Sequence, residues 1–123
     1  MNLKLVFRIA AVILVINGLG MLLMTSTFIA MANITPTPDL ITLGQFMGVT
    51  FLFLALVEWR IPDIAGDAVS SLGQLFAIGF GMWFLIVGYH IMTGAASGAT
   101  AYVNIALMAI LAVLFFMQSR KSE

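Results

Sequence analysis

The stretch "FLALVEWRIPDIAGDAVSS" (residues 53–71) decides the fold, because the chain on either side of it is almost free of charge. The chain has ten charged residues, five basic and five acidic, and four of them lie in this stretch. Residues 9–38 and 68–119 contain no Asp, Glu, Lys or Arg. Hydrophobic residues make up 63% of the 123 residues and charged residues 8%, against roughly 25% charged in a soluble domain. The composition predicts an integral membrane protein.

The length predicts a single transmembrane domain, residues 1–123. The formal net charge is zero, so nothing in the composition indicates a nucleic-acid partner. The absence of cysteine excludes thiol–disulfide chemistry, thiolate metal sites and iron–sulfur clusters within this chain. The first apolar run is about twice as long as the core of a signal peptide, so we interpret it as a membrane span.

Three breaks divide the apolar sequence into four predicted spans. They are "NITPTPD" (33–39), "EWRIPDIAGD" (58–67) and "TGAASGAT" (93–100). Thr37 and Pro38 suit the cap and the first position of a helix, whereas Pro62 disfavours helix at the residue before it. We expect spans at residues 6–32, 39–58, 68–92 and 99–118, each near the ~20 residues that cross a bilayer. The predicted fold class is all-α, an integral membrane four-helix bundle.

All the basic residues fall on one side of this arrangement. Four spans place both termini and the 58–67 loop on the same side, which then carries Lys4, Arg8, Arg60, Arg120 and Lys121. The opposite loops carry only Asp39. The positive-inside rule therefore predicts that both termini are cytoplasmic. We expect the inner (cytoplasmic) membrane of a bacterium as the location.

Small residues mark predicted helix-packing faces, since helices in lipid associate through close backbone approach. At about 100° per residue, one face of the second span carries small residues, namely Gly44, Gly48 and Ala55. A stripe on the third span contains Gly73, Ala77, Gly81 and Gly88. These faces are expected to be contacts inside the bundle, with a contact between copies of the chain as the alternative.

Four polar side chains are predicted to lie in the interior: Asn17, Glu58, Gln74 and Asn104. Asn17 lies near the middle of the first span, where an Asn is expected to bond to another helix or, alternatively, to bind a substrate. Glu58 shares the small-residue face of its span, where Ser70, Ser71 or Gln74 are expected hydrogen-bond donors.

The remaining polar residues of the opening stretch have expected roles at the membrane edge. Trp59 and Arg60 are predicted interface anchors. Asp63 and Asp67 are expected to cap helices, with binding of a divalent cation as the alternative.

His90, the only histidine, is predicted to share a face of the third span with Trp83. We expect an interfacial histidine, and the alternative is a ligand to haem or a chlorophyll-type pigment in an assembly. No second histidine or acidic residue lies near it in the sequence to complete a metal site. The chain also lacks the sequence patterns of Ser/His/Asp, HExxH and phosphate-loop enzymes. No enzymatic activity, resident cofactor or metal is therefore expected.

Three segments carry a resemblance to small four-span bacterial membrane proteins: "NGLGMLL" (17–23), "LGQFMGVTFLFLALVEW" (43–59) and "LGQLFAIGFGMWFLIVGYH" (72–90). The resemblance implies a four-span membrane fold and assigns no activity or site residue. The chain looks unlike the small multidrug transporters of similar size, because their essential Glu in the first span has no counterpart here.

Three functions remain as expectations. The first is a non-catalytic accessory or structural subunit, docking through its helix faces onto a larger membrane complex or onto copies of itself. The second is a small oligomeric transporter or channel, with a pore lined by Asn17, Thr50, Gln74 or Asn104. The third is a lipid- or pigment-binding module that uses the face of His90 and Trp83.

Overall fold

The computed structural model describes residues 1–121, and this part of the chain is helical throughout, with short connections. Its elements are α1 (Leu3–Leu23), α2 (Thr25–Met31), α3 (Pro38–Ile64), α4 (Val69–Met92) and α5 (Ala99–Lys121), with one 3₁₀ turn at Gly66–Ala68. Helices α1, α3, α4 and α5 are long and apolar enough to cross a membrane. The predictions of an all-α fold and of four apolar helices of spanning length are confirmed.

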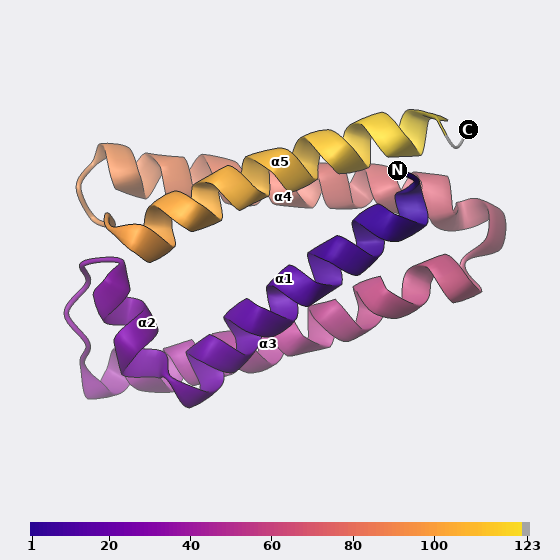
Figure 1. Ribbon diagram of the computed structural model, residues 1–123. Helices are drawn as coiled ribbons and strands as arrows, with labels where there is room; N and C mark the ends of the chain where they lie inside the picture. The colour runs from indigo at the N-terminus through magenta and orange to yellow at the C-terminus, as the bar shows by residue number, and fades with distance from the viewer. Residues whose placement is uncertain (122–123) are drawn as a thin grey trace.

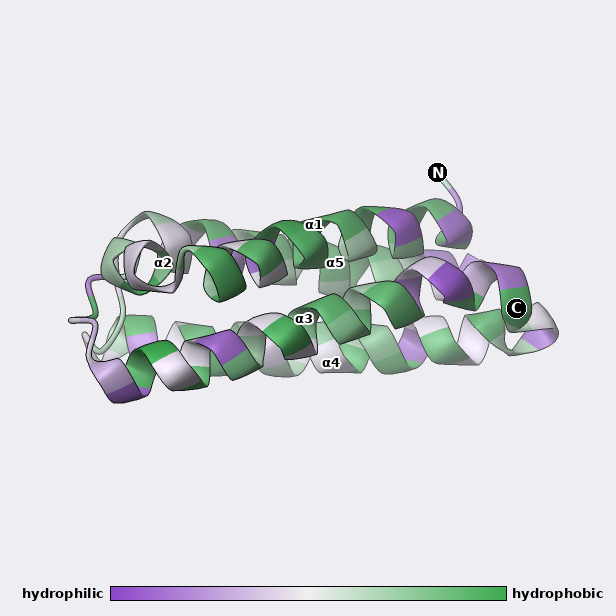
Figure 2. Ribbon diagram, turned by 90° about the horizontal axis from the view of Figure 1, so that it is seen from below, coloured by the Kyte–Doolittle hydropathy of each residue, from purple (hydrophilic) through white to green (hydrophobic). Residues whose placement is uncertain are grey.

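The four long helices run side by side as two pairs (Figure 1). Helix α1 packs along α3, and α4 packs along α5. A smaller contact between α1 and α5 joins the pairs, whereas α3 and α4 make few direct contacts although they are consecutive. Figure 2 shows hydrophobic residues along the long helices and hydrophilic residues mostly toward their ends. The four long helices are therefore arranged as two pairs that are joined mainly through α1 and α5.

The core takes residues from all four long helices, and its cluster of stacked aromatic rings lies where α1, α4 and α5 meet. The ring centroid of Phe7 is 4.9 Å from that of Phe115 and 5.4 Å from that of Phe76. The Phe80 ring stacks on Phe115 at 5.7 Å. Large apolar side chains on the outward faces remain exposed, for example Phe53 on α3 at 68%. Exposed apolar faces of this extent suit contact with lipid.

The segment expected to form one span at 6–32 is broken into α1 and α2 at Met24. Gly20 leaves room for the Phe28 ring, which occupies the place of a Cβ on that glycine. The Thr25 hydroxyl donates a hydrogen bond to the Met21 carbonyl, a local bond that competes with regular helical geometry. Helix α2 consequently turns away from the axis of α1 (Figure 1).

The predicted end of the second span at residue 58 is also displaced, because α3 continues through Pro62 to Ile64. Pro62 removes only the backbone hydrogen bond to the carbonyl of Glu58. Arg8 of α1 donates a hydrogen bond to Asp63 at 2.8 Å and so attaches the last turn to α1. Asp63 therefore forms an ion pair instead of a cap, and neither the 3₁₀ turn at Asp67 nor α4 has a side-chain cap.

Candidate functional site

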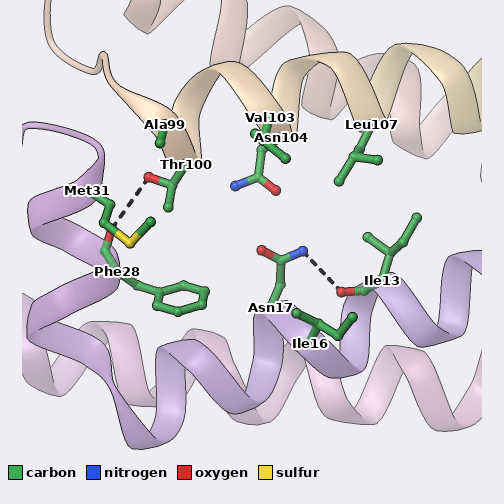
Figure 3. Close-up of a pocket in the computed structure, with 10 residues that line it drawn as sticks. All are labelled: Ile13, Ile16, Asn17, Phe28, Met31, Ala99, Thr100, Val103, Asn104 and Leu107. Atoms are coloured by element: carbon green, nitrogen blue, oxygen red, sulfur yellow. Dashed lines mark hydrogen bonds between the residues drawn. The ribbon is translucent and has the colours of Figure 1, made fainter.

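A pocket of about 240 Å³ lies between α1, α2 and α5. We call it the amide pocket, because the carboxamides of Asn17 and Asn104 face one another across it (Figure 3). The rest of its lining is mainly apolar: Ile13, Ile16, Phe28, Met31, Ala99, Thr100, Val103 and Leu107. Ile16 and Val103 are 61% and 57% exposed. The pocket therefore opens sideways between two membrane-length helices.

The two carboxamides make few hydrogen bonds within the described residues. Asn17 Nδ2 donates to the carbonyl of Ile13 in its own helix at 3.0 Å, so the expected bond to another helix does not form. Within residues 1–121, the Asn104 amide makes no hydrogen bond. Both residues are half-buried. The pocket thus presents hydrogen-bond donors and acceptors inside an otherwise apolar wall.

Helix α2 forms the end wall of the amide pocket. Asn33, which follows α2 and has a φ of 58°, donates from Nδ2 to Ser97 Oγ at 2.8 Å. The Ser97 N–H donates to the carbonyl of Ala32 at 2.9 Å. Gly98 packs so closely on the Met31 carbonyl that a Cβ there would lie 2.5 Å from the oxygen. We call these contacts the clasp, because they fasten the end of α2 to the loop between α4 and α5.

A second hollow, of about 250 Å³, lies between α3 and α4, and we call it the α3–α4 groove. Its lining is apolar: Leu14, Leu54, Leu75, Phe76, Gly79, Phe80, Trp83 and Met108. Within residues 1–121, no atom outside the adjoining part of α4 lies within 4 Å of the place that a Cβ on Gly79 would occupy. The Trp83 ring meets Phe51 edge-on at 5.0 Å. Apart from contacts such as this one, α3 and α4 make few direct contacts.

The predicted packing face of α3 lies against α1. Gly44, Gly48 and Ala55 are buried, and a Cβ on Gly48 would lie 2.8 Å from the backbone oxygen of Gly18. The backbones of α1 and α3 therefore approach closely at this point, as small residues allow.

The predicted stripe on α4 is less uniform. A Cβ on Gly73 would contact Ser119 and Leu3, and one on Gly88 would lie 3.4 Å from Ile105. Ala77 packs on the core. Among the described residues, no atom beyond the adjoining part of α4 lies within 4 Å of the Cβ position of Gly81, so Gly81 is not a point of close approach. The difference arises because α4 packs mainly along α5.

Glu58 is completely buried, and neither of its carboxylate oxygens has a hydrogen-bond partner in the described part of the chain. The expected donor Ser70 bonds instead to the carbonyl of Ser119 at 2.6 Å. Ser71 is exposed and Gln74 half-buried. The nearby guanidinium of Arg8 lies 4.2 Å from the Trp59 ring centroid and pairs with Asp63.

The same end of the molecule carries the predicted anchors. Trp59 and Arg60 are both exposed. Lys4 approaches Asp63 to 3.6 Å and is itself largely exposed. This end therefore combines one exposed ion-pair cluster with one buried carboxyl group.

His90 is exposed near the end of α4 and meets the ring of Tyr89 edge-on at 5.3 Å. It does not line the α3–α4 groove, although Trp83 does. Among residues 1–121, no cluster of three or more His, Asp or Glu side chains is placed to hold a metal ion. His90 therefore belongs to no such cluster in the described part of the chain.

The amide pocket as a whole was not predicted, although Asn17 and Asn104 were each expected in the interior. The only sequence signal for the clasp was indirect. Asn33 and Gly98 adopt positive φ angles, which Asn and Gly tolerate better than other residue types. No protein-family model, curated protein or solved structure matches the chain.

Proposed function

We propose that the protein is a non-catalytic structural subunit of a membrane assembly, and that it docks through the α3–α4 groove onto a helix of a second copy. In this proposal it resides in a bacterial inner membrane with both termini cytoplasmic. One observation carries the proposal. Two consecutive membrane-length helices make few direct contacts and leave an apolar groove between them.

The groove has the surface properties that helix association in lipid requires. Close approach there depends on small residues and shape complementarity, because burial of apolar surface gives no advantage over lipid. Gly79 offers this close approach, since nothing occupies its Cβ position. The groove wall contains no charged residue, so its occupant is an apolar helix surface.

The chain itself provides a suitable occupant. The outward face of α3 presents Phe46 and Phe53, which are 67% and 68% exposed. Side chains of this size can enter a hollow of about 250 Å³. The α3 face of one copy would then fill the α3–α4 groove of the next.

A matched pair of substitutions tests this function. Gly79→Leu would fill the groove, whereas Gly81→Leu adds the same side chain to the opposite side of α4, since two residues turn the helix by about 200°. Both positions have room for a Cβ. We expect two differently tagged wild-type copies to co-purify in mild detergent. Gly79→Leu should reduce the amount of the second copy that co-purifies by at least about tenfold, and Gly81→Leu should leave it unchanged.

The outcomes separate the possible occupants. A wild-type monomer, or undiminished self-association of Gly79→Leu, would contradict the proposal. If a different membrane protein co-purifies in place of a second copy, the groove docks onto another subunit and not onto this chain. That conclusion requires that Gly79→Leu abolishes the co-purification and that Gly81→Leu does not.

A transporter or channel is the second candidate, and one observation favours it. Asn17 and Asn104 come together in the amide pocket (Figure 3), whereas the exposed Thr50 bonds within its own helix to Phe46. A flux of ions or small solutes into liposomes that Asn17→Ala abolishes would support this candidate. Equal flux with wild type, Asn17→Ala and empty liposomes would reject it.

A further inference from the structure

We propose that the amide pocket binds a membrane-dissolved molecule with a compact, oxygen-bearing ring on an apolar tail, the chemical class of the quinones and quinols. The site is separate from the α3–α4 groove, and it does not depend on the docking proposed above. Access, size and polarity of the pocket lead to this class.

Access to the pocket is from the side. The clasp and α2 close its end, through the bond of Asn33 to Ser97 and through Phe28 and Met31 in the wall. Thr100 on α5 adds a hydrogen bond from its hydroxyl to the Phe28 carbonyl at 3.5 Å. The exposed side chains Ile16 and Val103 border the pocket between α1 and α5. A ligand that enters there comes from the lipid phase.

The size of the pocket fits a ring better than a whole lipid. A volume of about 240 Å³ accommodates roughly eight to ten non-hydrogen atoms, at about 25–30 Å³ each. A substituted six-membered ring has this size. An apolar tail attached to the ring would leave the pocket past Ile16 and Val103 into the membrane.

The polarity of the pocket selects oxygen groups on that ring. Each carboxamide offers both N–H donors and a carbonyl acceptor, and the Asn104 amide makes no bond within the described residues. A ring carbonyl would accept from these amides, and a ring hydroxyl would donate to them. No charged residue lines the pocket, so an ionic head group would remain unpaired there. The pair Asn17 and Asn104 therefore favours a neutral, oxygen-bearing ring.

The test uses the full chain in nanodiscs of saturated phosphatidylcholine, titrated with decylplastoquinone as the probe, because its dimethylbenzoquinone head is within the size that the pocket accommodates. Native mass spectrometry would report the fraction of protein that carries one probe molecule. We expect wild type to bind one molecule, and Asn104→Leu and Asn17→Leu each to bind about fivefold to tenfold more weakly, because each loses one or two hydrogen bonds. Gln45→Leu is the matched control, since it removes an exposed amide that lies outside the pocket.

Further variants separate a blocked pocket from the loss of an amide and from a loss of folding. Val103→Trp would obstruct the mouth of the pocket without removing an amide, and we expect it to weaken binding as well. Far-ultraviolet circular dichroism would establish that each variant retains its helices. Gly79→Leu is expected to bind the probe as wild type does, so that failure of the docking proposal leaves this test intact.

Two results would overturn the proposal. One is the absence of probe binding by wild type, or equal binding by wild type, Asn17→Leu and Asn104→Leu. The other is retention of phospholipid, in place of the probe, with the same dependence on Asn17 and Asn104, because the pocket would then select an acyl ester instead of a ring.

Discussion

Glu58 lies on the face of α3 that packs against α1, and its side chain is completely buried. Its position on this face followed from its spacing to Gly44, Gly48 and Ala55. The absence of a hydrogen bond to Glu58 could not be predicted in this way, because Ser70 donates to the carbonyl of Ser119, a partner that depends on the packing of α4 against α5. A helical wheel gives the direction of a side chain, whereas its partners depend on how neighbouring helices pack.

Replacing Glu58 by Met is expected to stabilise the monomer. A buried polar group without a partner costs about 1–3 kcal/mol, and Met keeps a similar volume, so Glu58→Met should raise the free energy of unfolding by about that amount. Thermal unfolding in detergent, followed by circular dichroism, measures the change. The control Asp63→Asn weakens exposed ion pairs and should cost at most about 1 kcal/mol. Destabilisation by Glu58→Met would contradict this prediction, because the buried carboxyl group would then contribute to the stability of the folded chain.

Helix α2 shows which features of the elements were visible in the sequence. The four long helices were predictable from apolar runs and breaks, since length and composition alone specify a membrane-length helix. The break at Met24 was not, because it depends on the fit of Phe28 against Gly20 and on the clasp between Asn33 and Ser97. Residues 64 positions apart in the chain form that hydrogen bond, so local spacing carries no information about it.

The clasp predicts unequal effects of two glycine substitutions in the loop between α4 and α5. Gly94 and Gly98 both have positive φ, at 81° and 85°, but only Gly98 also lacks space for a Cβ. Gly94→Ala should cost about 1–2 kcal/mol through backbone strain alone. Gly98→Ala should cost about 1–3 kcal/mol more, because it also pushes against the Met31 carbonyl. Thermal unfolding of both variants compares them, and equal losses would mean that the clasp does not hold α2.

At the scale of the whole molecule, the paired arrangement of helices is the feature that the sequence left open. Small-residue faces predicted contacts for both α3 and α4, and the face with Gly48 does contact α1. On the side between α3 and α4, Gly79 has free space, because no described atom outside the adjoining part of its own helix lies within 4 Å of its Cβ position. Spacing identifies a face that can pack, whereas the number of such faces in use depends on the available partners.

The orientation proposed for the four helices can be tested with single cysteines, because the natural chain has none. Thr35 lies in the connection between α2 and α3 and Asp67 in the turn between α3 and α4, and both are exposed. With cytoplasmic termini, a membrane-impermeant maleimide should label Thr35→Cys in intact spheroplasts and Asp67→Cys only after lysis. Wild type gives the background. The reverse pattern would invert the molecule, and the basic end with Arg8 and Arg60 would then face away from the cytoplasm.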